Sequence, residues 1–95
     1  MSPTTAVTIQ VPAALGQYCD GASDLSVTAP NVGAALEEIE RKHPLLYRNL
    51  CDETGTVRRH LNVFVNASHI RDRDGLDTAV APGDVVTILA AVSGG

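Results

Sequence analysis

The C-terminal end of this sequence constrains its fold more than any other stretch. Residues 85–89 are apolar and rich in β-branched side chains, which predicts a buried β-strand. Six small residues follow, and the chain ends on Gly94 and Gly95. A strand of the core therefore leads directly into a thin segment whose terminal carboxylate can enter a narrow slot on another protein. A terminal pair of glycines is, by itself, more typical of a solvated tail, and the rest of the chain has to decide between the two interpretations.

Composition and charge narrow the class of protein. The 95 residues suffice for one domain with a hydrophobic core, and the net charge of -4 argues against nucleic acid as a partner. Residues 1–5 lack the charged leader and apolar stretch of a signal peptide, and no apolar run reaches the length of a membrane span. We therefore expect a soluble, cytoplasmic protein with no membrane partner. It is built as a single domain over residues 1–95, in which residues 90–95 form a flexible C-terminal tail.

The N-terminal third of the chain predicts a β-hairpin. Residues 7–11 alternate apolar and polar side chains, which is the pattern of a half-buried strand, and Pro12 ends the alternation. Residues 13–23 contain two glycines and indicate a turn. Residues 25–27 then form a short second strand that pairs with the first.

A helix is predicted after the hairpin. Asn31 is a favourable N-cap, and helical backbone is disfavoured at His43 because Pro44 follows it. Between these limits, four apolar residues lie at helical spacing and form one face: Val32, Ala35, Leu36 and Ile39. A short helical turn is then expected to close one end of the core with three leucines: Leu45, Leu46 and Leu50.

The remaining elements complete a mixed sheet. Residues 61–66 alternate cleanly, residues 69–71 indicate a short return strand, and Pro82-Gly83 turns the chain into the strand at 85–89. Two strands, a crossing helix and a return to the sheet place the terminal strand parallel to the first, near the middle of the sheet. The predicted fold class is therefore α+β, with one main helix packed across a mixed sheet. This is the β-grasp, or ubiquitin-like, arrangement.

Candidate metal ligands and catalytic groups are few. The histidines and cysteines are His43, His60, His69, Cys19 and Cys51. They lie in different predicted elements and form no C-x-x-C or H-x-x-x-H pattern, so we expect no metal site. The sequence also contains no glycine-rich phosphate loop and no evident Ser-His-Asp set. It therefore gives no sign of an active site of its own.

Two apolar side chains are predicted to lie outside the core, at the base of the tail. If residues 61, 63 and 65 point inward, then Phe64 points outward, and the same alternation leaves Leu89 outside on the last strand. Exposed apolar clusters often mark binding surfaces, which makes Phe64 and Leu89 a candidate partner-docking patch. The alternatives are a loop that covers both side chains, or a strand phase shifted by one residue.

With these features in place, the chain resembles the ThiS/MoaD family of ubiquitin-like sulfur carrier proteins over nearly its whole length. The resemblance rests on residues 59–66 (RHLNVFVN), residues 75–78 (GLDT), residues 82–89 (PGDVVTIL) and the terminal VSGG. Within the family, the sequence is most similar to the actinobacterial-type carriers associated with cysteine biosynthesis.

The resemblance implies that the protein is not an enzyme but a protein co-substrate. An adenylating enzyme of the ubiquitin-activating type would convert the Gly95 carboxylate into an acyl-adenylate. It would use ATP and Mg²⁺, which that partner binds and this chain does not. A sulfur source would displace AMP and leave a thiocarboxylate, from which a downstream synthase would take its sulfur. The segment that threads the partner's active site would be Ala91, Val92, Ser93 and Gly94.

The sequence departs from the family in two places. Ala90-Ala91 stands where many members have one or two prolines, and residues 66–69 (NASH) replace the acidic turn usual in the cysteine-type carriers. Both departures leave the identity of the downstream synthase undecided. The chain would serve cysteine biosynthesis, or instead act as the small subunit of molybdopterin synthase or as the carrier for thiamin or a specialised metabolite. A ubiquitin-like modifier conjugated through Gly95 and a β-grasp interaction domain with an inert tail are further alternatives.

Overall fold

The computed structural model describes residues 6–90, and its elements follow the predicted order. These elements are β1 (Ala6–Gln10), η1 (Ala13–Cys19), β2 (Asp24–Thr28), α1 (Val32–Lys42), α2 (Pro44–Leu50), β3 (Leu61–Val65), β4 (Ser68–His69), η2 (Ile70–Asp72), η3 (Gly75–Asp77) and β5 (Val85–Ala90), where η marks a short 3₁₀ helix. In this part of the chain, no helix is both long enough and apolar enough to cross a membrane.

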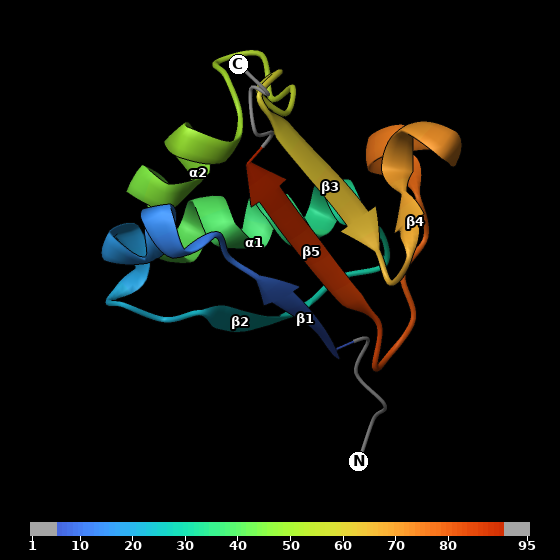
Figure 1. Cartoon of the computed structure of the whole chain (residues 1–95). Coiled ribbons are helices and arrows are strands. Elements are labelled where there is room, and N and C mark those ends of the chain that lie inside the picture. The colour runs from blue at the N-terminus through green and yellow to red at the C-terminus, as the bar shows by residue number, and fades with distance from the viewer. Residues whose placement is uncertain (1–5, 91–95) are drawn as a thin grey trace.

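The strands form one mixed sheet in the order β2-β1-β5-β3-β4. β5 is the central strand, parallel to β1 and antiparallel to β3. Figure 1 shows α1 crossing behind the sheet, while no helix of the described residues covers the face turned toward the viewer. We call this uncovered side the outer face. The predicted α+β fold class and the β-grasp arrangement are confirmed.

Local sequence signals set the limits of both helices. The Asn31 side chain caps α1, because its Oδ1 accepts the backbone N–H of Ala34 over 2.8 Å. α1 ends at Lys42, before the His43-Pro44 pair, and Pro44 opens α2 as its first helical residue. Leu46 and Leu50 of α2 are buried as predicted, but Leu45 is 59% exposed. Residues four apart share one helical face, whereas Leu45 lies about 100° away from Leu46 around the axis.

The core lies between the sheet and α1. Ile9, Val86 and Ile88 are at most 1% exposed, and the sheet register places Ile9 beside Val86 and Val63 opposite Ile88. The predicted apolar face of the helix is buried as well: Val32, Ala35, Leu36 and Ile39. Both central strands therefore present alternate residues to the core, which confirms the predicted inward phase of the last strand.

Several predicted boundaries differ from the structure. The turn predicted over 13–23 begins as η1, because buried Cys19 draws this segment onto the core. The return strand ends at His69, since Ile70 is also buried and starts η2. The tail was predicted to start at residue 90, but Ala90 belongs to β5 and pairs with Leu61.

Candidate functional site

The predicted site consists of the C-terminal tail and the patch beside it. Gly95 and the threading segment of residues 91–94 lie outside the described residues. What the structure describes is the root of the tail, where Ala90 pairs with Leu61 at the start of β3. β5 is held by β1 near its beginning and by β3 along its length. The tail is therefore rooted in the centre of the sheet rather than at an edge.

The start of β5 is tied to the β3–β4 turn by a pair of polar side chains. Asn66 adopts left-handed backbone with φ of 55°, and its Oδ1 accepts the backbone N–H of Val85 over 3.1 Å. The Asn66 Nδ2 group donates to Asp84 Oδ1 over 3.2 Å, while Asp84 Oδ2 accepts the Ala81 N–H over 2.8 Å. The Ala81 and Asn66 hydrogen bonds lower the pKa of Asp84. These contacts support the register of β5 against β3.

Sequence reasoning missed this role of Asn66, which it treated only as a departure from the family's acidic turn. An available signal was the side chain itself, because asparagine is one of the few residues that tolerate left-handed backbone in a two-residue turn. Its partner Asp84 lies eighteen residues away in the chain, so the tie itself is visible only in the folded structure.

Phe64 and Leu89 lie on the outer face, as predicted from the alternation. Leu61, Val63 and Val65 are buried, Phe64 is half-buried and Leu89 is 49% exposed. Phe64 pairs with Thr87, so Leu89 is its diagonal neighbour across the strand pair. Diagonal neighbours of this kind are about 7–8 Å apart, within reach of an aromatic side chain. We call Phe64 and Leu89 the outer-face patch.

Phe64 is partly covered by His69 rather than by a loop. The two rings meet edge to face with centroids 5.0 Å apart. His69 Nδ1 accepts the backbone N–H of Arg71 over 2.9 Å, so the proton of the neutral ring lies on Nε2. Nε2 then donates to Asn62 Oδ1 over 3.0 Å. His69 therefore holds Phe64 in place, a role that depends on the β3–β4 register and has no local sequence signal.

The rest of the outer face is mostly polar, apart from Ala6 on β1 and Val85 at the start of β5. On β1 and β2 it carries Thr8, Gln10 and Ser26, and the Thr87 hydroxyl donates to Gln10 Oε1 over 3.0 Å. Among the described residues of this face, Leu89 is the large apolar side chain that is exposed, and together with Phe64 it lies next to the root of the tail. A partner that docks there would lie next to Ala90, the last residue of β5.

Both cysteines are buried and free. The Cys19 thiol contacts the carbonyl oxygens of Gly16 and Ala22, and burial raises the pKa of Cys51 to about 11. Among residues 6–90, no three His, Cys, Asp or Glu side chains come together in a way that could hold a metal ion. The cysteines therefore act as small core side chains.

We expect both cysteines to be dispensable for any chemistry at the terminus. The Cys19→Ala and Cys51→Ala double variant should form a C-terminal thiocarboxylate as well as the unaltered chain, once circular dichroism confirms its fold. In the native chain, the Cys51 thiolate fraction at pH 8 should be about a hundredfold below that of an ordinary thiol, so Ellman's reagent should react slowly. A well-folded double variant that forms no thiocarboxylate would contradict this.

Comparison with known proteins places the chain in a family. The model of the ThiS family matches residues 12–95. The sulfur carrier protein CysO of Mycobacterium tuberculosis is 35% identical over 91 residues, which are 94% of this chain and 98% of that protein. The small archaeal modifier protein 3 of Haloferax volcanii is 34% identical over 64 residues, or 67% of this chain and 68% of that protein.

Solved structures show the same similarity. The crystal structure of M. tuberculosis CysO matches with a TM-score of 0.84 and 34% identity, covering 90% of this chain and 99% of that one. A chain in the crystal structure of the Amycolatopsis orientalis BexX/CysO complex matches with a TM-score of 0.85 and 31% identity, covering 94% of this chain and 99% of that one. Since fold, family model and relatives agree over almost the whole length, this protein is a member of the ThiS family.

Proposed function

We propose that this protein is a sulfur carrier whose C-terminal Gly95 becomes a thiocarboxylate and donates its sulfur to a biosynthetic enzyme, in cysteine biosynthesis. One observation carries the proposal. The similarity to CysO spans nearly the full length of both proteins, and the family match runs to residue 95, so that it includes the terminal Gly94-Gly95.

The chemistry requires little of the carrier beyond an accessible carboxylate. An α-carboxyl group has a pKa of about 3.3–3.7, so Gly95 is ionised at neutral pH. A carboxylate oxygen attacks the α-phosphorus of ATP and pyrophosphate leaves, which gives the acyl-adenylate. A sulfide-level sulfur then attacks the acyl carbon and AMP leaves with the electron pair. The activating partner binds ATP and Mg²⁺. Both proteins act in the cytoplasm, where ATP is available.

The root of the tail and the outer-face patch would position the terminus for this step. A ubiquitin-activating-type enzyme binds the outer-face patch, while residues 91–94 enter the active site of that enzyme. Because β5 is anchored in the centre of the sheet, the distance from the patch to the start of the tail is fixed. A downstream sulfur-accepting synthase would use the same geometry in the next step.

A second candidate function is a ubiquitin-like modifier attached to other proteins through Gly95. The similarity to the small archaeal modifier protein 3 favours it. Lys42 is the only lysine in the sequence, so lysine-linked chains of this protein would have a single attachment site.

Intact-mass spectrometry separates these functions. The purified chain is incubated with host extract, ATP and sulfide, and a parallel sample lacks ATP. A sulfur carrier gains one exchange of oxygen for sulfur, which tandem mass spectrometry locates at Gly95. A modifier instead shifts to high-mass conjugates. An unchanged mass in the presence of a functional activating enzyme would rule out both functions.

Phe64→Ala is expected to weaken the complex with the activating enzyme by about 1–3 kcal/mol, the range of an interface hot spot. Leu45→Ala is the matched control, because Leu45 is also an exposed apolar side chain but lies on α2. Isothermal titration calorimetry measures both affinities, and thermal unfolding reports stability. If Phe64→Ala unfolds the domain while the folded fraction binds normally, Phe64 serves the fold rather than docking.

A further inference from the structure

A cavity of about 420 Å³ opens beside the start of β3, separate from the outer-face patch. It lies between residues 56–59 on one side and η2 and η3 on the other. Its lining residues are Thr56, Val57, Arg58, Arg59, Leu61, Val63, His69, Ile70, Arg71, Gly75 and Leu76. The volume falls within the range of about 300–1,000 Å³ that small-molecule sites occupy.

The floor of this cavity is apolar. Leu61, Val63 and Ile70 are buried residues of the core, and the half-buried side chains of Val57 and Leu76 extend the apolar surface. An apolar floor favours a ligand with an apolar body, because water leaves both surfaces when they meet.

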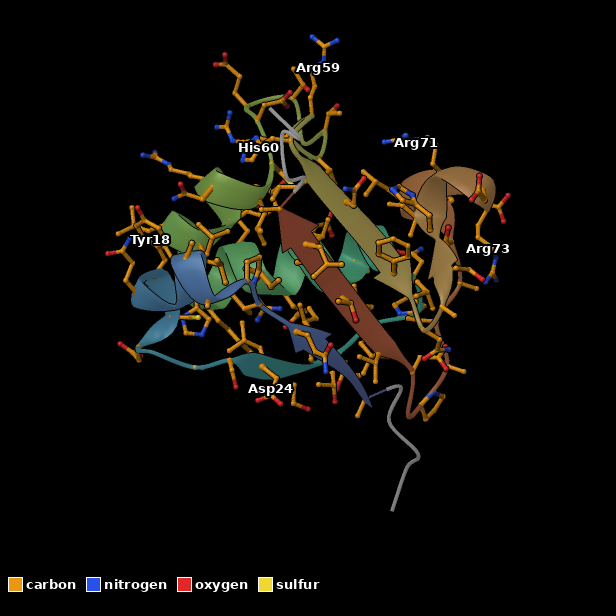
Figure 2. The ribbon with its side chains drawn as sticks, viewed as in Figure 1. Tyr18, Asp24, Arg59, His60, Arg71 and Arg73 are labelled. Atoms are coloured by element: carbon orange, nitrogen blue, oxygen red, sulfur yellow. The ribbon has the colours of Figure 1, made fainter. Side chains whose placement is uncertain are left out.

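The charged residues of the cavity are all arginines: Arg58, Arg59 and Arg71. Among residues 6–90, no aspartate or glutamate lines it, although the whole sequence has 11 acidic residues against 7 basic ones. A second cavity, by contrast, combines two arginines with Glu40, Asp52 and Glu53. Arg58 lines both cavities, so the positive charge that belongs to the first cavity alone is that of Arg59 and Arg71. Figure 2 shows Arg59 above β3 and Arg71 on the adjacent helical turn, at the same end of the molecule.

Hydrogen bonds hold the Arg58 side chain and the backbone of Arg71. Arg58 Nε donates to the carbonyl oxygen of Arg48 over 2.9 Å, which holds this side chain against α2, where it also lines the second cavity. The Arg71 N–H donates to His69 Nδ1, which fixes the start of η2. Guanidinium groups match phosphate oxygens in paired geometry, and a phosphate monoester offers three terminal oxygens where a carboxylate offers two.

We propose that this cavity, the arginine cavity, binds an organic phosphate monoester, with the phosphate on the arginines and the apolar body on the floor of Leu61, Val63 and Leu76. The proposal is independent of sulfur transfer and concerns a second site on the chain. A ligand bound there would contact Leu61, the strand partner of Ala90, and would therefore lie beside the root of the tail.

Phenyl phosphate is the probe, added to the full-length ¹³C-methyl-labelled chain without any partner and followed by NMR. We expect saturable shifts of the Leu61, Val63 and Leu76 methyl signals, with a Kd on the order of 1 mM that rises with added NaCl. Phenol and inorganic phosphate should each bind at least about tenfold more weakly, since each lacks one half of the recognised group.

Variants identify the site. Arg59→Gln and Arg71→Gln, singly and together, should weaken phenyl phosphate binding, by about tenfold or more in the double variant. Arg73→Gln is the matched control, because Arg73 is an exposed arginine close to Arg71 that does not line the cavity. Both mutated side chains are exposed, so thermal midpoints should stay unchanged, and the single variants serve if the double variant misfolds.

Several results would overturn the proposal. One is a titration that never saturates, and another is an equal loss of affinity in Arg73→Gln and Arg71→Gln. Equal binding of inorganic phosphate would show that the apolar floor takes no part. Equal binding of benzoate would refute the preference for phosphate. Because the carrier is tested alone, a failure here leaves the proposed sulfur carrier function untouched.

Discussion

Removal of Gly95 is expected to abolish adenylation of the chain while leaving its thermal midpoint nearly unchanged. The deletion withdraws the terminal carboxylate by one residue, about 3.3–3.6 Å, and in-line attack on the α-phosphorus does not tolerate such a displacement. The fold should persist, because the described core side chains lie between Val7 and Ile88, well before the deleted residue.

Gly94→Val tests the same requirement without shortening the chain. It keeps the carboxylate at its distance but adds a β-branched side chain to a backbone that must pass close to a nucleotide. Ser93→Ala is the matched control, since it preserves both length and small size. The assay is ATP–pyrophosphate exchange with the cognate activating enzyme. Normal exchange by the chain lacking Gly95 would show that Gly95 is not the site of activation, and the carrier function would be refuted.

Ile88→Ala is expected to lower the free energy of unfolding by about 2–5 kcal/mol, because it opens a cavity in the core. Ile88 is 1% exposed and pairs with Val63 across the central strands. A domain of this size has a total stability of about 5–15 kcal/mol, so the loss is a large share. Urea denaturation followed by circular dichroism measures it.

Leu89→Ala is the matched control, one residue along the same strand but on the outer face. Leu89 is 49% exposed, so its truncation should change stability by only about 0.5 kcal/mol or less. It should nevertheless reduce affinity for the activating enzyme, whereas Ile88→Ala should not once the folded fraction is taken into account. The reverse pattern would mean that the phase of β5 is shifted by one residue, and the outer-face patch would lose its basis.

Much of the fold followed from short-range patterns in the sequence. Alternation along residues 61–66 and 85–89 predicted which side chains face the core, because successive side chains on a strand point to opposite faces. Asn31 and the His43-Pro44 pair predicted the limits of α1, because capping and the proline restriction act within a few residues. The same logic placed Phe64 and Leu89 outside, and the structure confirms their positions.

The tertiary structure decided what those positions touch. His69 packs on Phe64, and Asn66 donates a hydrogen bond to Asp84. Arg59 and Arg71 line the same cavity. Each contact depends on how β3 pairs with β4 or β5. The residues that flank each partner in the sequence carry no sign of that pairing. The sequence by itself determined the β-grasp order, the phase of the strands and the glycine terminus, because these depend on residues close together in the chain. The outer-face patch as a shaped surface and the arginine cavity exist only once strand pairing brings distant residues together.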